Sequence, residues 1–181
     1  IKEGGAMVAA VRRYGRIFQH CTQRRSNNEQ KLRDSCELVR NGRIGKVLYA
    51  RVTVGPAPRI DTPDYSARVE APDPETFDWD MWLGPAPWRP YAGMDITRNW
   101  QQFRDFGLRS IGNWASHTLD MAQWALGKDA EGPVAIVPAG EGEEHLTIRY
   151  ADGVRIVCPR TEGDSAECSV HGTEGAKLIF A

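Results

Sequence analysis

From residue 134 onward the chain consists of five short, strand-like segments separated by tight turns. The segments span residues 134–138, 145–150, 154–159, 166–171 and 176–180. Two of the turns, Ala151-Asp152-Gly153 and Gly172-Thr173-Glu174-Gly175, have the glycine and aspartate composition that is typical of hairpins. Because short strands on successive hairpins pair with antiparallel neighbours, this part of the chain predicts an antiparallel meander.

The N-terminal quarter predicts two helices and two strands. Apolar residues with a period near 3.6 predict a helix over residues 3–14 and a second one from a cap at Asn27 or Asn28 to about Arg40. Apolar and polar residues alternate in two segments, which predicts strands. These are residues 16–22 and 46–54.

The middle of the chain has a different composition. Residues 55–76 contain five prolines, which predict a long excursion over the surface because proline fits neither a continuous helix nor a central strand. A short helical turn is expected at residues 78–83. The strongest helical pattern covers residues 113–126, with Asn113 as its cap and Gly127 directly after its last turn.

Charge, hydropathy and motifs argue against several classes of protein. With 23 basic and 24 acidic residues the net charge is −1, so no nucleic acid partner is expected. The longest apolar run, residues 6–11, is far shorter than the ~20 residues that cross a bilayer, so no membrane partner is expected. The start of the chain lacks a secretory pattern, and the four cysteines lack metal-ligand spacing. We therefore expect a cytoplasmic protein with reduced thiols and no metal. No GxGxxG motif is present, so no cofactor-binding residues are predicted in this chain.

One face of the predicted helix 113–126 carries a candidate catalytic set. Asn113 and His117 are four residues apart, and Asp120 is one turn further on the same side. Histidine exchanges protons near neutral pH, and an aspartate beside it could orient the ring. The alternative is a structural histidine that is hydrogen-bonded in a packed helix, which is the commoner role. Spacing alone leaves both interpretations open.

All six tryptophans fall within the segment from Trp79 to Trp124. Indole rings can line a cleft in which sugar rings stack, or they can anchor irregular, loop-rich structure. We interpret Trp82, Trp88 and Trp124 as anchors. Trp79 and Trp100 remain candidate substrate-binding residues, as does Asp120 near the histidine.

The basic segment Thr22-Gln23-Arg24-Arg25-Ser26 lies between a predicted strand and a predicted helix. Loops at strand ends commonly face ligands, and an arginine there can hold an anionic or hydroxyl-rich group. A solvated basic turn is the alternative.

Several strings, taken together in order, resemble one known family. They are YGRIFQHCTQRRSN, ELVRNGRIGKV, DWDMWLGPAPWRPY, GNWASHTLDMAQWALG and HGTEGAKL. The family is that of the glucose-fructose oxidoreductase, inositol dehydrogenase and MocA proteins (Gfo/Idh/MocA). The resemblance implies an α+β fold, with an open, mostly antiparallel β-sheet and helices packed on one face. It also implies that residues 1–22 are a remnant of the last helix and strand of a dinucleotide-binding Rossmann domain. Residues 23–181 would be the C-terminal substrate-binding and oligomerisation domain.

The resemblance also suggests roles for individual residues. His117 matches the family's catalytic histidine, which exchanges a proton with the substrate hydroxyl. Asn113 falls where many members have aspartate, and an amide can orient a hydroxyl but cannot act as a base. Gln23 and Arg24 match the loop that faces the nicotinamide and the substrate. Bulky residues occupy the segment 106–112, where relatives often have consecutive glycines.

The family's glycine-rich fingerprint and its Glu-Lys-Pro segment would lie before Ile1, and its closing helix after Ala181. Hydride transfer needs a nicotinamide held against the substrate carbon. We therefore expect this chain to be the substrate-binding and oligomerisation domain of an NAD(P)-dependent sugar or polyol oxidoreductase, and we expect the domain to be inactive alone.

NAD or NADP would be bound only in the complete enzyme, and copies would associate through the sheet as a homo-oligomer. One alternative is a stand-alone binding or scaffold protein derived from such an enzyme. Another is part of an NAD-dependent glycosidase.

Overall fold

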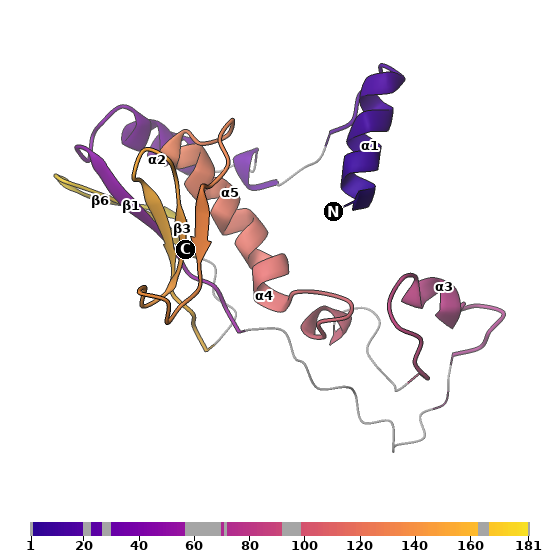
Figure 1. Ribbon diagram of the computed structural model, residues 1–181. Coiled ribbons are helices and arrows are strands. Elements are labelled where there is room, and N and C mark those ends of the chain that lie inside the picture. Colours follow the sequence, from indigo (N-terminus) through magenta and orange to yellow (C-terminus); the bar gives the residue numbers. More distant parts are fainter. Residues whose placement is uncertain are drawn as a thin grey trace.

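The computed structural model describes residues 2–19, 23–26, 30–56, 70, 72–91, 99–162 and 167–180. Its helices are α1 (Lys2–Arg13), α2 (Gln30–Arg40), α3 (Trp79–Leu83), α4 (Arg109–Gly112) and α5 (Trp114–Leu126), with 3₁₀ turns η1 (Gln23–Arg25) and η2 (Asn99–Gln102). Its strands are β1 (Val47–Val52), β2 (Ala135–Val137), β3 (Leu146–Arg149), β4 (Arg155–Cys158), β5 (Cys168–Gly172) and β6 (Gly175–Phe180). The strands form one open sheet, and α2 and α5 pack against one of its faces (Figure 1). The predicted α+β fold class is confirmed.

The sheet has the strand order β2-β3-β4-β1-β5-β6. All neighbouring strands are antiparallel except β1 and β4, which pair in parallel with Tyr49 opposite Arg155. The expected meander is therefore wrong at one point, because β1 lies between β4 and β5. Ala50 and Val52 of β1 are completely buried, and this apolar burial explains why the strand occupies the middle of the sheet.

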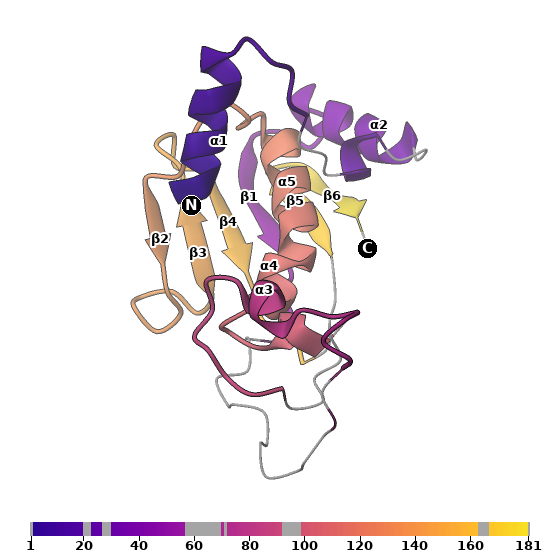
Figure 2. The ribbon, with the colours of Figure 1, turned by 90° about the vertical axis from the view of Figure 1, so that its right-hand side faces the viewer.

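The core lies between the sheet and the two helices that cover it. Alternate residues of β1, β4 and β5 point toward α5, as the side-chain period of two requires. Figure 2 shows α5 lying along this face, with α2 near β6. The buried contributors include Ala50, Val52, Ile156, Cys158, Cys168 and Val170 from the strands and Leu32, Cys36, Val39, Met121, Ala122 and Ala125 from the helices.

Helix α1 confirms the first predicted helix and stands away from the sheet (Figure 1). The strand expected at residues 16–22 is wrong for residues 16–19, where the backbone is irregular and Ile17 is fully exposed. Strand pairing needs a neighbour, and none of the described strands lies against this segment. Residues 20–22 and the expected caps Asn27 and Asn28 lie outside the described residues.

The middle helices form largely as the sequence predicts. Asp78 caps α3, where its side-chain oxygen accepts a hydrogen bond from the Met81 backbone N–H at 2.9 Å. Gly127 ends α5 in the left-handed conformation at φ 69°. Asn113 occupies the N-cap position of α5 as expected, but its side chain makes no capping hydrogen bond. Its backbone is helical and its N–H donates to the Arg109 carbonyl, because α4 leads directly into α5. Most of the proline-rich segment 55–76 lies outside the described residues.

Candidate functional site

Helix α5 is the element that positions His117. Its buried face packs on the sheet through small and flexible residues, and His117 lies half-buried beside that face. The Trp114 ring meets the imidazole edge-on, with ring centroids 6.1 Å apart and planes at 60°. The Nδ1 atom of His117 is buried and has no hydrogen-bond partner within the part of the chain that the structure describes. A structural histidine normally satisfies such an atom, so this one is a candidate for chemistry.

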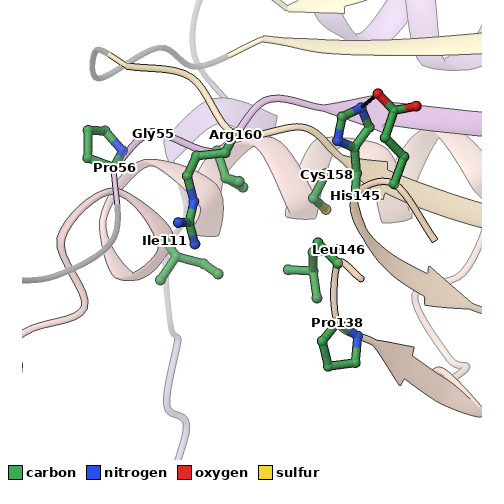
Figure 3. A pocket seen from close by; sticks show the side chains of 11 residues that line it. Gly55, Pro56, Ile111, Pro138, His145, Leu146, Cys158 and Arg160 are labelled. Atoms are coloured by element: carbon green, nitrogen blue, oxygen red, sulfur yellow. Dashed lines mark ion pairs between the residues drawn. The ribbon is translucent and has the colours of Figure 1, made fainter. Parts of the chain in front are cut away.

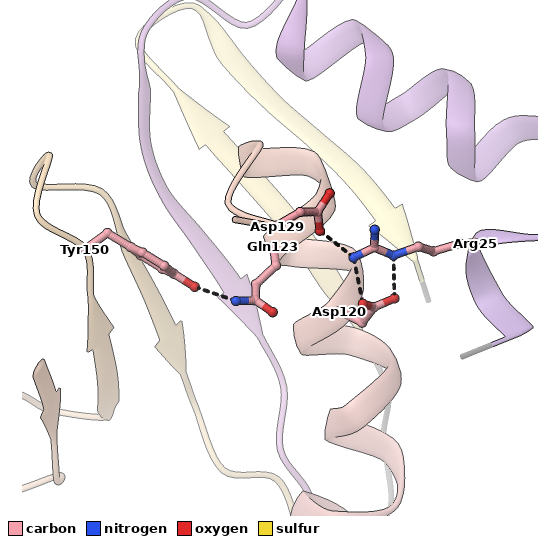
Figure 4. A network of polar contacts seen from close by, with 5 residues as sticks. All are labelled: Arg25, Asp120, Gln123, Asp129 and Tyr150. Carbon is pink, nitrogen blue, oxygen red and sulfur yellow. Dashed lines mark hydrogen bonds and ion pairs between the residues drawn. The ribbon is translucent and has the colours of Figure 1, made fainter. Parts of the chain in front are cut away.

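The spacing suggested that Asp120 could orient His117, but in the structure the Asp120 carboxylate binds Arg25 instead. Its two carboxylate oxygens accept hydrogen bonds from Arg25, at 2.8 Å from Nε to Oδ2 and 2.7 Å from Nη2 to Oδ1 (Figure 4). Arg25 also reaches Asp129 at 2.6 Å and lies over the Trp124 ring at 5.5 Å. These two carboxylates hold the pKa of Arg25 above its ordinary value, so the guanidinium stays charged.

The Arg25 contacts bring the basic loop to the helix. Gln23, Arg24 and Arg25 together form η1, which packs against α2 and α5. Gln23 is exposed, and Arg24 is half-buried. On the other side of α5, the Gln123 amide donates to the Tyr150 hydroxyl at 3.3 Å (Figure 4). The helix that carries His117 is thus fixed to the loop and to the sheet.

Asn113 connects this helix to the tryptophan-rich segment. Its side-chain amide donates to Oε1 of Gln101 at 3.1 Å. Trp100 directly precedes Gln101 in η2, and it lines a hollow of about 310 Å³ with Trp82 and Phe106. Asn113 therefore links the start of α5 to the segment that carries Trp100.

Trp79 is surrounded by other aromatic rings. It stacks on Trp82 with centroids 4.9 Å apart and meets Tyr91 edge-on at 5.2 Å. Its indole nitrogen donates to the Arg89 carbonyl at 2.8 Å. The anchor role expected for Trp82 and Trp124 is confirmed by such packing. The anchor role expected for Trp88 is wrong, because this side chain is 72% exposed.

The approach to α5 is shaped by residues 106–112. Arg109 has a positive φ of 49°, a conformation that costs a non-glycine residue roughly 1–2 kcal/mol. Gly107 is tightly enclosed, since a Cβ there would lie 2.9 Å from the Gln101 carbonyl oxygen. Leu108 and Ile111 are exposed. This turn therefore combines one strained backbone position with bulky side chains at the start of the helix.

A second cavity, of about 590 Å³, opens where strands β1 and β4 end and β3 begins (Figure 3). Its two nitrogen-bearing side chains, His145 and Arg160, were not among the predicted site residues. His145 is the first residue of one predicted strand and Arg160 directly follows another, and this position at strand ends was the signal that could have found them. His117 does not line this cavity, although Ile111, just before α5, does.

The described residues hold no group of histidine, cysteine and acidic side chains that could bind a metal ion. Within the same residues, no helix has both the length and the apolar character that crossing a bilayer requires.

Comparison with known families decides the relationship. The family described as "Oxidoreductase family, C-terminal alpha/beta domain" of the Gfo/Idh/MocA proteins matches residues 28–180. The chain belongs to the Gfo/Idh/MocA family. The match covers the domain that holds α2, α5 and the whole sheet, so this oxidoreductase domain includes both His117 and the cavity at the strand ends.

Two solved structures match most of this chain at low sequence identity. GenD2 from gentamicin A biosynthesis, in complex with NAD, is 19% identical, with a TM-score of 0.44; the match covers 82% of this chain and 36% of GenD2. A protein from Sinorhizobium meliloti 1021 assigned as a myo-inositol dehydrogenase is 18% identical, with a TM-score of 0.46, over 96% of this chain and 44% of that protein. The chain thus spans less than half the length of these structures. No curated protein matches the sequence.

Proposed function

We propose that this chain is the substrate-binding and oligomerisation domain of an NAD(P)-dependent sugar or polyol oxidoreductase. Residues 23–181 would form this domain, and residues 1–22 would belong to the dinucleotide-binding domain. The family match over residues 28–180 supports the reaction class. The observation that carries the assignment of the site is the buried, unpartnered Nδ1 of His117 among the described residues.

In this proposal the residues on α5 and η1 handle the substrate hydroxyl that is oxidised. His117 takes the proton of that hydroxyl during oxidation and returns it during reduction. Asn113 orients the hydroxyl through its amide, which can donate and accept but cannot act as a base. Gln23 and Arg24 line the approach from η1, and Trp100 offers a ring face to the sugar. Asp120 acts indirectly, because its carboxylate holds η1 through Arg25.

We propose no phosphate-binding site for the dinucleotide on this chain. The sequence contains no glycine-rich phosphate-binding motif, so we place no cofactor contact on residues 1–181. The proposal for this chain is therefore limited to holding the substrate and moving one proton.

The test is a spectrophotometric assay of the protein as its gene encodes it. A panel of sugars and polyols is offered with NAD⁺ or NADP⁺, and the reduced nicotinamide is followed by absorbance. We expect His117→Gln to lower the rate roughly 100- to 10,000-fold, which is the usual effect of losing a general acid–base. Arg43→Gln, an exposed substitution in the turn after α2 and away from α5, serves as the control. Full activity of His117→Gln would refute the role, and reduction of neither cofactor by any of these compounds would refute the function.

We further propose that two copies associate through the sheet face that α2 and α5 leave open. That face carries Tyr49 stacked on His171, with ring centroids 4.5 Å apart and planes at 7°, and Arg155 over the Tyr49 ring. A flat aromatic and arginine surface of this kind is typical of interfaces. Light scattering of the protein and of Tyr49→Asp measures the outcome: we expect a dimer or larger assembly that the substitution weakens. A monomer at micromolar concentration would contradict it.

The cytoplasm is the compartment that we propose for this domain. Cys36, Cys158 and Cys168 are free thiols in the structure, which agrees with a reducing environment.

A further inference from the structure

The cavity at the strand ends is a binding site that neither the family match nor the proposed proton transfer accounts for. Its walls come from four strands of the sheet and from α4. They include the apolar side chains of Val54, Pro56, Ile111, Pro138, Leu146 and Cys158. At about 590 Å³ it has the size of a small-molecule pocket.

Arg160 is the arginine that lines this cavity. Figure 3 shows its side chain extending from the end of β4 across the opening toward Ile111. Its backbone is held in place on both sides: the Val54 N–H donates to the Pro159 carbonyl at 3.0 Å, and the Thr161 N–H donates to the Val54 carbonyl at 2.8 Å. The side chain of Arg160, which is exposed, therefore starts from a fixed backbone position at the end of β4.

Arg160 also lacks a carboxylate partner among the described residues, unlike several other arginines. Arg25, Arg51, Arg89 and Arg149 each form an ion pair with a carboxylate. A guanidinium is always charged at neutral pH, and one that faces an apolar cavity without a partner attracts an anion.

The charges of the other polar groups in the cavity favour a ligand with one negative charge over a ligand with two. The Cys158 thiol stays neutral, because burial raises its pKa to about 11. His145 offers an imidazole that can bind a hydroxyl or a carboxylate oxygen. Glu144 lies 3.7 Å from His145 Nε2 and is 88% exposed, so its charge lies at the rim. A rim carboxylate repels a doubly charged phosphate more strongly than a singly charged carboxylate.

We propose that this cavity binds a carboxylate-bearing sugar or sugar acid, with Arg160 as the residue that selects the acid group. One guanidinium forms two parallel hydrogen bonds with a carboxylate, and the apolar walls accommodate the carbon skeleton. The inference goes beyond the proposed function, since His117 does not line this cavity and no proton transfer is placed in it. It makes Arg160 the residue that selects an acidic ligand and assigns it no chemical step.

The test is equilibrium binding by calorimetry with two matched probes, D-glucuronate and D-glucose, which differ at one carbon in carrying a carboxylate or a hydroxymethyl group. We expect the protein to bind glucuronate about tenfold more tightly or better, which corresponds to about 1.4 kcal/mol. Arg160→Gln should abolish this difference and leave glucose binding unchanged. Arg160→Lys should restore it in part, because an ammonium keeps the charge without the planar fork. Arg43→Gln removes an equal charge from an exposed turn outside the cavity and should change neither affinity.

Each other outcome overturns the proposal. Equal affinities for the two probes, no binding of either, or a glucuronate preference that survives in Arg160→Gln would do so. Inorganic phosphate as a third probe tests the choice of anion, and tighter binding of phosphate than of glucuronate would also contradict it. An unchanged unfolding temperature of Arg160→Gln shows that the variant is folded.

The binding result is independent of the hydride-transfer assay. Cofactor reduction by neutral polyols without any preference for the acid would leave the proposed function standing and refute the acid site. A preference for glucuronate that depends on Arg160, without cofactor reduction by any sugar or polyol, would leave the acid site standing and refute the proposed function.

Discussion

Arg25 and Asp120 form a two-point ion pair although 95 positions separate them in the chain. Their side chains are 34% and 21% exposed, so water screens the pair only in part. We expect Asp120→Asn to lower the free energy of unfolding by about 1–2 kcal/mol, because hydrogen bonds to charged groups contribute roughly 1.5–3 kcal/mol and partial exposure reduces this contribution. Urea unfolding measures the loss. The exposed Arg33–Glu37 pair within α2 provides the control, because Glu37→Gln should have little measurable effect. Equal effects of the two substitutions would contradict the prediction.

The same residue pair shows what sequence patterns could and could not predict. The apolar spacing of residues 113–126 predicted α5 and its end at Gly127, because helix period and left-handed glycine are local properties. That Asp120 faces Arg25 and not His117 depends on how η1 docks onto α5. The position of η1 against α5 is determined by tertiary packing, which cannot be inferred from the spacing of residues along one helix.

Strand β1 makes the same point for the sheet. The alternation in residues 46–54 predicted the strand itself, and the hairpin turns predicted β2 to β4 and β5 to β6 as antiparallel pairs. The insertion of β1 between β4 and β5 depends on contacts between residues that are far apart in the sequence. This insertion places Val54 next to Arg160 and so forms the cavity that local patterns did not predict.

Gly172 is required by the close approach of two backbone segments. A Cβ at this position would lie 2.1 Å from the Ile44 carbonyl oxygen, which itself accepts a hydrogen bond from the Glu174 N–H at 3.0 Å. A backbone carbonyl held in this way cannot move aside without losing that bond. We expect Gly172→Ala to lower the free energy of unfolding by about 1–3 kcal/mol, as measured by urea unfolding. Gly132→Ala, where a Cβ meets nothing within 4 Å, should be neutral or slightly stabilising. Similar losses in both variants would contradict the steric explanation.

Lys128 links the end of α5 to the turn after β3. Its ammonium lies 2.8 Å from Asp152 Oδ2 and 2.7 Å from Glu131 Oε2, and its side chain is only 8% exposed. The hydrogen bond from Lys128, followed by that from the Val154 N–H, holds the pKa of Asp152 below its usual value. Because this pKa is lowered in the folded state, the contribution to stability is complete above about pH 4, the ordinary aspartate range. It is lost as the pH falls through the folded-state pKa.

Thermal unfolding between neutral and strongly acidic pH measures this contribution. We expect the unfolding temperature of the protein to fall with acidification below about pH 4, and that of Asp152→Asn to fall less. Glu141→Gln removes an exposed carboxylate for which no ion pair is found among the described residues, and its curve should parallel that of the unchanged protein. A curve of Asp152→Asn that runs parallel to that of the unchanged protein would show that the Lys128–Asp152 ion pair does not cause the loss of stability in acid.

Three buried thiols predict the opposite pH dependence. Burial raises the pKa of Cys36 and of Cys158 to about 11 and that of Cys168 to about 12. An unfolded cysteine has a pKa of about 8.5, so the folded state holds these protons more tightly. Their contribution is complete below that pH and is lost as the pH rises toward 11, at up to about 1.4 kcal/mol per pH unit for each thiol. We therefore expect the free energy of unfolding to decrease between about pH 8.5 and 11.

Comparison with Cys158→Ala separates the thiols from the lysines and tyrosines that titrate in the same window. The variant loses some stability at every pH because of the smaller side chain, but its decrease above about pH 8.5 should be shallower. A thiol-specific reagent gives an independent measurement. Because the three side chains are almost completely inaccessible, they should react only when the protein unfolds. Rapid labelling of Cys158 in the folded protein would contradict its burial beneath the cavity, and a slope identical to that of the variant would show that its thiol does not contribute.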